Sequence, residues 1–282
     1  MTAILDSLAG LSVGDALGAQ YFVPGNRTDA LPDPPWPWTD DTEMACSVVT
    51  ELLTHGTVDH GRLAEAFAER YEPYRGYGGG AVVILHAIRD GVPWRAAAGA
   101  AFGGQGSCGN GAAMRVAPLG AFFAGDPDRA VEEAVRSAEV THLHPEGVQG
   151  AVAVALAAAH RGEEPLLDFV LDRLADSEVR RGVVRARELL GRSAAEAAHV
   201  LGNGSRETAQ LTVPFTLWVS ASHLADYPAA ITTCVRAGGD VDTTSAIVGG
   251  VVAAHTGREG IPAEWIAARE PLPDWTATRR PS

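Results

Sequence analysis

The amino-acid sequence predicts an all-α protein. Alanine-rich stretches with apolar residues at helical spacing recur along the 282 residues, whereas period-two alternation of β-branched and polar residues is scarce. Glycine and proline clusters interrupt these stretches, as expected of loops between helices. With 46% hydrophobic residues the chain can bury a large core, and we expect one domain over residues 1–282.

Ten segments carry the helical pattern, and each stops at a glycine, a proline or a short polar stretch. In chain order they span residues 44–53, 62–70, 82–88, 130–138, 148–160, 166–174, 179–190, 208–224, 229–236 and 243–255. The clusters between helices predict loops at residues 23–37, 76–80, 103–111, 125–127, 202–204 and 257–262. The tail at residues 271–282 contains prolines and terminal arginines, and we expect it to be loosely held.

Charge and composition exclude several classes of protein. The formal net charge of −13 leaves no basic face for a nucleic-acid backbone, so we expect no binding to nucleic acid. The chain contains no lysine, which excludes a Walker A phosphate loop and a lysine Schiff base. An anionic ligand must therefore be held by metal ions, arginines or helix N-termini.

The cysteines and the apolar runs indicate a cytoplasmic protein. Cys46, Cys108 and Cys234 are odd in number and far apart, which indicates neither a disulfide framework nor a thiolate zinc site. The N-terminus lacks the pattern of a signal peptide, and no apolar run approaches the roughly 20 residues that cross a bilayer. We expect no membrane partner.

Two acidic helix starts are the strongest chemical signal. Thr39, Asp40, Asp41 and Thr42 precede the helix predicted from residue 44. Such a segment alone is most often a helix cap, because threonine and aspartate are preferred N-caps and acids suit the helix dipole.

The same grouping recurs at the second start, where Asp240, Asp242 and Thr243 follow Gly238 and Gly239. If the two starts converge, four carboxylates share one small volume and require cations. Oxygen ligands from aspartate and threonine suit Mg²⁺ or Mn²⁺, whereas zinc prefers nitrogen or sulfur.

A glycine-dense loop at residues 103–111 runs into an apolar helical segment. Its exposed amides could cradle a diphosphate without lysine, although a flexible turn explains the glycines equally well. We interpret Met114 as a core residue and Arg115 as an internal ion-pair partner. Two histidines precede a later alanine-rich helix. Because no third nitrogen or sulfur ligand is near, we expect His142 to donate a hydrogen bond to a ligand. His144 would either cap the helix or support the residues that contact the ligand.

In combination these segments resemble the ADP-ribosylglycohydrolases, including the dinitrogenase-reductase-activating type, which cut ADP-ribose from modified molecules. The resemblance covers most of the chain. Five motifs occur in the family's order: GDALG at 14–18, TDDT at 39–42, GSCGNGAAMR at 106–115, THLHPEG at 141–147 and GGDVDT at 238–243.

The resemblance implies a compact, multi-helix orthogonal bundle with a binuclear Mg²⁺ or Mn²⁺ centre below an ADP-ribose cleft. It implies these metal-binding residues: Thr39, Asp40, Asp41, Asp240, Asp242 and Thr243. It implies these substrate-binding residues: Ser107, Cys108, Gly109, Asn110, Gly111, Met114 and His142.

The paired metals would grip the ribose diol and orient a water at the scissile C1″ bond. The expected catalytic residues are Asp40, Asp41 and Asp242, with carboxylates stabilising an oxocarbenium-like state and Asp41 handling the proton.

One departure concerns Phe22, because many members, including those resembling serine-ADP-ribose hydrolases, carry a glutamate there. Phenylalanine neither binds metal nor moves a proton, so arginine-linked or small-molecule substrates become more plausible. We expect a monomer that acts on ADP-ribose attached to a protein or small molecule. Two alternatives remain: an ADP-ribose-binding module without turnover, indicated by Phe22, and a two-metal nucleotide phosphohydrolase, since paired metals also suit phosphoryl transfer.

Overall fold

The computed structural model describes residues 2–276 and confirms an all-α fold. No strand occurs among these residues, which form only isolated β-bridges, between Trp36 and Arg269 and between Gly109 and Thr208. The α-helices of the described part are α1 (Thr2–Ala19), α2 (Asp40–His55), α3 (His60–Arg70), α4 (Gly79–Arg89), α5 (Trp94–Gly104), α6 (Ala117–Phe122), α7 (Pro127–Glu139), α8 (Pro145–Ala159), α9 (Leu166–Leu171), α10 (Glu178–Glu188), α11 (Ala194–Leu201), α12 (Val213–Ser222), α13 (Tyr227–Ala237), α14 (Val241–Thr256) and α15 (Ala263–Ala268). Short 3₁₀ turns lie at Gln20–Phe22, Pro73–Arg75, Asn110–Ala112, Ala209–Leu211 and Arg258–Gly260.

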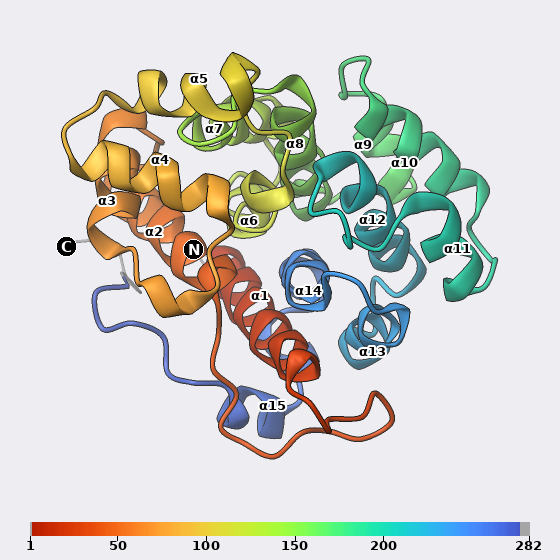
Figure 1. Ribbon diagram of the computed structural model, residues 1–282. Helices are drawn as coiled ribbons and strands as arrows, with labels where there is room; N and C mark the ends of the chain where they lie inside the picture. Colours follow the sequence, from red (N-terminus) through yellow and green to blue (C-terminus); the bar gives the residue numbers. More distant parts are fainter. Residues whose placement is uncertain (1, 277–282) are drawn as a thin grey trace.

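Helices from opposite ends of the chain, α1 and α14, pack side by side in the middle of the molecule (Figure 1). Gly10, Gly14 and Gly18 form one face of α1, because residues four apart lie above one another on a helix. A Cβ at Gly14 would lie 2.1 Å from the Ser245 carbonyl oxygen, so only glycine permits this approach. The contact places Asp15 of α1 beside the first turn of α14.

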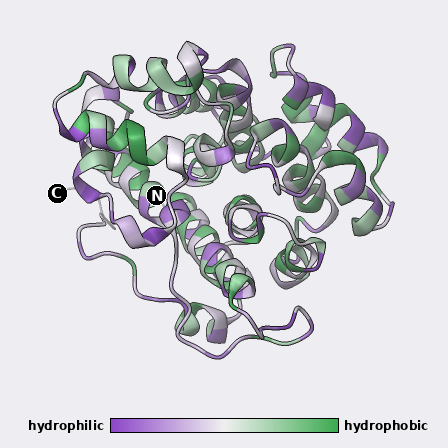
Figure 2. Ribbon diagram, in the orientation of Figure 1, coloured by the Kyte–Doolittle hydropathy of each residue, from purple (hydrophilic) through white to green (hydrophobic). Residues whose placement is uncertain are grey.

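The remaining helices surround this pair according to their apolar pattern. Most residues of α8 and α14 are buried, so both helices are enclosed on nearly every side. In α10 the buried residues Val179, Gly182, Val183 and Ala186 recur at three- or four-residue spacing, which is typical of a helix at the surface. Figure 2 shows hydrophilic residues on such outer helices. No helix of the described part combines the length and hydrophobicity that a membrane crossing needs.

Several helices are absent from the sequence prediction: α1, α5, α6, α11 and α15. Of these, α1 is buried almost throughout from residue 7, so it has no polar face and gives no amphipathic pattern. The segment at 208–224, predicted as one helix, divides into a 3₁₀ turn and α12. The predicted loop at 76–80 overlaps the start of α4, and that at 103–111 overlaps the end of α5.

The segment at residues 271–276 is held more firmly than we expected. The Trp38 indole donates to the Pro271 carbonyl oxygen at 3.1 Å, and the Arg70 guanidinium lies 4.2 Å from the centre of a Trp275 ring. Thr276 is 7% exposed. The rest of the predicted loose tail, residues 277–282, lies outside the described residues.

Candidate metal centre and its cavity

The two acidic helix starts, whose convergence the sequence analysis assumed, lie together. Thr39 is the N-cap of α2 and Asp40 its first residue, while Asp240 is the N-cap of α14. Oxygens of Asp41, Asp242 and Asp15 lie within 4.8 Å of one another. Asp15 comes from α1, so three helices supply carboxylates to one point.

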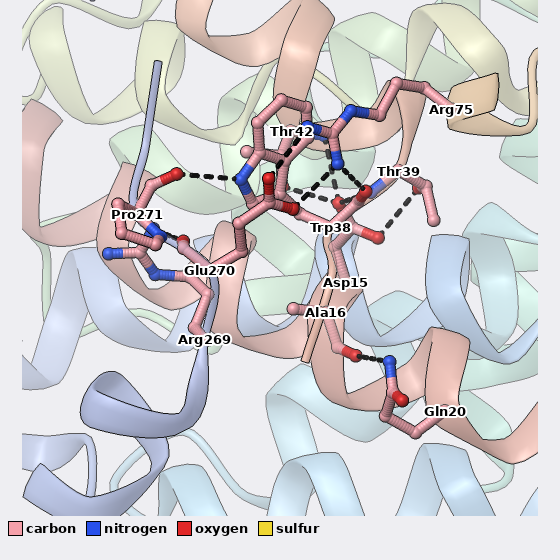
Figure 3. Close-up of polar contacts among 10 residues, drawn as sticks. All are labelled: Asp15, Ala16, Gln20, Trp38, Thr39, Thr42, Arg75, Arg269, Glu270 and Pro271. Atoms are coloured by element: carbon pink, nitrogen blue, oxygen red, sulfur yellow. Dashed lines mark hydrogen bonds and ion pairs between the residues drawn. The ribbon is translucent and has the colours of Figure 1, made fainter. Parts of the chain in front are cut away.

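Asp15 is a site residue that the sequence analysis did not single out. It is fully buried and accepts hydrogen bonds at 2.5 to 3.1 Å from the backbone N–H and the hydroxyl of both Thr39 and Thr42 (Figure 3). Four donors occupy its lone pairs, so Asp15 is better suited to positioning the start of α2 than to binding a cation. The glycine spacing around Asp15 was the signal that could have identified it.

The Thr39 hydroxyl links Asp15 to Asp41. Its oxygen lies 2.7 Å from Asp15 Oδ1 and 3.0 Å from Asp41 Oδ2. A hydroxyl has one proton and two lone pairs. When the proton goes to Asp15, a lone pair remains for a cation.

Burial and mutual repulsion raise the pKa of every carboxyl in the cluster. Burial raises the pKa of Asp15 and Asp242 to about 6, and burial with the charge of Asp242 raises that of Asp240 to about 7. Burial followed by neighbouring aspartates raises the pKa of Asp40 and Asp41 well above the usual value. The cluster therefore favours protons or cations at neutral pH.

The buried Asp41 Oδ1 atom makes no hydrogen bond within the described chain. An unpaired carboxylate oxygen at 1% exposure is costly unless a cation occupies its free direction. The surrounding donors are all carboxylate and hydroxyl oxygens, which suit hard divalent ions. The residues present thus fit a metal centre.

A cavity of about 240 Å³ opens above the cluster. Asp40, Asp240, Asp242 and Thr243 reach it, while Thr39 and Asp41 are not among its lining residues. Of the predicted substrate-binding residues, those that line it are Ser107, Gly109, Asn110, Gly111, Met114 and His142. Cys108 is half-buried and does not line it.

Asn110 connects the glycine loop to the acidic cluster. Its side-chain amide donates to Asp240 Oδ2 at 2.6 Å and to the Thr212 hydroxyl at 3.2 Å. Ser107 Oγ accepts from the Gly109 N–H, and the Asn110 N–H donates to the Glu207 carbonyl oxygen. These hydrogen bonds hold the glycine loop against the acidic cluster. The loop is therefore not a flexible turn.

A chain of hydrogen bonds sets the protonation of His142. Arg115 Nη2 donates to the Thr141 hydroxyl at 2.9 Å, and that hydroxyl lies 2.7 Å from His142 Nδ1. Since the described residues offer the hydroxyl proton no other acceptor, it goes to Nδ1, and the ring proton stays on Nε2. Burial and the charge of Arg115 lower the pKa of His142 to about 3, so the ring is neutral.

His142 Nε2 faces the glycine loop, since a Cβ at Gly109 or Gly111 would lie 3.3 Å from it. This geometry suits the expected donor to a ligand. His144 caps α8 as expected, because its ring accepts from the Glu146 N–H.

Arg115 corrects one prediction, since it has no ion-pair partner among the described residues. Its fully buried guanidinium donates instead to the Gly111 and Ser137 carbonyl oxygens and to Thr141, and it lies 4.6 Å from the centre of the Phe67 ring. Burial lowers its pKa to about 9.

The wall opposite the glycine loop consists of residues 76 and 78–81. Glu43 holds it in place: its Oε2 accepts from the Tyr77 hydroxyl at 2.7 Å and from the Glu72 N–H at 3.2 Å. Arg75 in the same loop pairs with Glu270 at 2.7 Å (Figure 3). The contacts of this wall join segments far apart in the chain.

Phe102 and Glu207 line the cavity in an unusual backbone conformation. Their φ angles are 52° and 54°, in the left-handed region that non-glycine residues seldom adopt. Phe102 sits at a kink in α5, and its ring packs over Gly80. Such strain is concentrated at functional sites.

An all-helical fold with oxygen-donor carboxylates under a glycine-lined cavity defines a class of enzyme with a candidate metal centre. Comparison with known families specifies the class: residues 2–279 match the ADP-ribosylglycohydrolase family, and the chain belongs to it. The chain is therefore a hydrolase that acts on glycosidic bonds.

The similarity to known relatives covers nearly the whole chain. ADP-ribosylhydrolase ARH3 of Homo sapiens is 30% identical over 320 residues, which cover 92% of this chain and 86% of the relative. An uncharacterised protein of Archaeoglobus fulgidus is 30% identical over 289 residues, covering 92% and 88%. A solved structure described as an ADP-ribosylglycohydrolase-related protein complex matches with a TM-score of 0.63 at 26% identity, covering 95% of this chain and 92% of that one.

Proposed function

We propose that the protein is a metal-dependent hydrolase that cleaves the C1″ glycosidic bond of ADP-ribose, with arginine as the favoured acceptor. The observation that carries the proposal is the convergence of carboxylates from the starts of α2 and α14 beside the cavity. The family supports cleavage of ADP-ribose linkages, and human ARH3 bears the name of an ADP-ribosylhydrolase.

Six residues would hold two Mg²⁺ or Mn²⁺ ions: Thr39, Asp40, Asp41, Asp240, Asp242 and Thr243. The unpaired Asp41 Oδ1 and the raised pKa values support this assignment. When bound, the ions would supply Lewis-acid contacts to the ribose hydroxyls and lower the pKa of a water molecule.

The protein's own carboxylates would stabilise the positive charge that develops at C1″. Asp40 and Asp242 line the cavity, so they can approach the sugar, whereas Asp41 lies behind them. We therefore assign the proton transfer to Asp40, in place of Asp41, and keep Asp41 as a metal-binding residue.

The glycine loop and His142 would bind the rest of ADP-ribose. Backbone N–H groups between Ser107 and Gly111 suit the diphosphate, because an acidic chain without lysine needs backbone donors there. His142 would donate from Nε2 to a ribose or phosphate oxygen. The predicted role of Cys108 is limited to its backbone, since its side chain is not part of the lining.

Two observations favour arginine as the acceptor. Glu207 lines the cavity, and its negative charge attracts a guanidinium group. Phe22, at the position of the family glutamate, is 55% exposed and is not among the lining residues. The glutamate-dependent chemistry of other members therefore has no counterpart at this position.

Product analysis of modified substrates tests the proposal. With Mn²⁺ or Mg²⁺ present, we expect free ADP-ribose from an arginine-modified protein, less from a serine-modified one, and none after chelation. AMP or inorganic phosphate as the product would instead indicate phosphoryl transfer. Tight binding of ADP-ribose without release from any linkage would show that the protein binds ADP-ribose but does not hydrolyse its linkages.

We also propose that the protein acts as a single-domain monomer in the cytoplasm. Cys46, Cys108 and Cys234 are all free thiols, and two of them are buried. Free thiols are typical of a reducing compartment.

A further inference from the structure

A second hollow, of about 480 Å³, lies at the C-terminal end of α13, which the loop with Asp240 follows. Its lining residues come from α11, from the loop after α11 and from the end of α13: Ala195, Ala198, His199, Gly202, Asn203, Ser205, Arg206, Leu211, Arg236 and Ala237. This hollow has no role in the proposed hydrolysis.

The hollow differs in charge from the rest of the molecule. The chain carries 35 acidic against 22 basic residues, yet the lining contains Arg206, Arg236 and His199 and no carboxylate. Within the described part of the chain, none of these three side chains forms an ion pair or a hydrogen bond. Asp29 is near Arg236, but the hydrogen bonds that it accepts, at 2.8 and 2.6 Å, come from Arg27.

The hollow and the catalytic cavity share one thin loop. Arg206 lines the hollow, and its neighbour Glu207 lines the cavity. Asn203, in the hollow, accepts from the Asp240 N–H at 3.1 Å and donates to the Ala237 carbonyl oxygen at 2.9 Å. Arg206 and Glu207 are consecutive residues, and their Cα atoms are therefore about 3.8 Å apart. A substrate that extends out of the cavity past Glu207 can reach Arg206.

We propose that this hollow is an oxyanion subsite, which binds a phosphate or carboxylate group on the ADP-ribosylated acceptor. The inference rests on the proposed function for the identity of the acceptor, whereas anion binding itself does not. Unpaired arginines offer forked N–H donors that match both groups, and Ser205 adds a hydroxyl. The acceptor would then place a cation beside Glu207 and an acidic group beside Arg206.

The first experiment measures anion binding without turnover. Inorganic phosphate is titrated into the metal-free protein saturated with ADP-ribose, and arginine side-chain N–H signals are followed by NMR. We expect shifts at Arg206 and Arg236, and at least a tenfold loss of affinity in R206Q/R236Q. The matched control is Arg192→Gln, an exposed arginine outside the hollow. Absence of any shift at Arg206 and Arg236 overturns the proposal.

The second experiment identifies the source of the anion. Two arginine-modified peptides are compared, one with aspartates beside the modified residue and one with alanines. A KM several-fold lower for the acidic peptide, lost in R206Q/R236Q with kcat unchanged, supports an acceptor subsite. Equal KM values together with phosphate shifts assign the site to free phosphate and overturn the acceptor role. Absence of turnover on both peptides, with the phosphate shifts present, contradicts the proposed function and leaves the anion site standing.

Discussion

At the scale of single residues, the site depends on which hydrogen-bond donors and acceptors surround each buried charged group. The sequence was sufficient to predict the aspartates and threonines of both helix starts, because their residue types are repeated at two places. It was not sufficient for Asp15 or Arg115. The role of each depends on which groups fold against it: four donors around Asp15, and carbonyl oxygens in place of a carboxylate around Arg115.

Replacement of Asp242 by asparagine tests the metal centre. We expect the affinity for Mn²⁺, measured by isothermal titration calorimetry, to fall by about 100-fold or more, because loss of outer contacts alone costs about 10- to 100-fold. Asp172→Asn, at an exposed aspartate outside the cluster, should bind Mn²⁺ as the wild type does. Unchanged affinity in the Asp242 variant would remove this residue from the centre.

Replacement of Thr141 by valine tests the hydrogen-bond chain to His142. The change removes the hydroxyl between Arg115 and His142 and leaves a buried donor unpaired, at a cost of about 1–3 kcal/mol. We expect the affinity for ADP-ribose to fall about tenfold in calorimetry. Thr141→Ser keeps the hydroxyl and should restore binding. A serine variant as weak as the valine variant contradicts the relay.

Replacement of Glu207 by glutamine tests the preference for a cationic acceptor. We expect KM for an arginine-linked substrate to rise about fivefold, which corresponds to roughly 1 kcal/mol for a charge pair at a rim. KM for a serine-linked substrate should stay constant, because that acceptor carries no charge. Equal changes for both substrates would show that Glu207 acts on the ADP-ribose half.

At the scale of the elements, the close contact of α1 and α14 determines where the carboxylates meet. The sequence predicted α14 and the start of α2 but not α1, since a helix buried on every side has no polar face. The short helices α6 and α15, of six residues each, were missed as well, because six residues give fewer than two turns of pattern. The equally short α9 was found only as part of a longer predicted segment at 166–174.

Replacement of Gly14 by alanine tests this contact. The new Cβ would lie 2.1 Å from the Ser245 carbonyl oxygen, so α1 and α14 must separate. We expect a loss of about 1–3 kcal/mol in the free energy of unfolding and weaker Mn²⁺ binding. At Gly99, in α5, the nearest atom to an added Cβ is 3.7 Å away, so Gly99→Ala should gain about 0.5–1 kcal/mol. Denaturant unfolding of both variants measures the difference, and equal stabilities would contradict the steric argument.

At the scale of the whole molecule, aspartates from distant parts of the chain gather where α1, α2 and α14 meet. The net charge of −13 is the reason to expect no nucleic-acid binding, and several acidic residues of the chain converge on one buried point. The all-α class was predictable from periodicity. The hollow with Arg206 and Arg236 was not, because its members belong to three segments without a common pattern.

The stability of the metal-free protein should depend on pH through this cluster. The folded-state pKa values of Asp15, Asp240 and Asp242 are raised to about 6 to 7, so the folded protein holds protons that the unfolded chain has released. Their contribution to stability is complete below pH 4 and is lost as the pH rises through 6 to 7. Cations bound by the proposed centre would replace these protons.

We therefore expect Mn²⁺ to raise Tm by several degrees at pH 7.5 and by much less at pH 5, where protons compete for the same oxygens. Thermal unfolding with and without Mn²⁺ at both values measures this. The Asp242→Asn variant provides the control, and its Tm should respond weakly at either pH. An equal rise at pH 5 and pH 7.5 would contradict the linkage.

The pairing of α1 with α14 also has a consequence for biosynthesis. Because the first helix finds its partner only near the end of the chain, a ribosome must translate residue 256 before the centre can assemble. Until then the glycine face of α1 has no neighbour, and a nascent polypeptide cannot capture metal at this place. A prematurely terminated product should therefore be inert, and it should be removed by proteolysis before it can act.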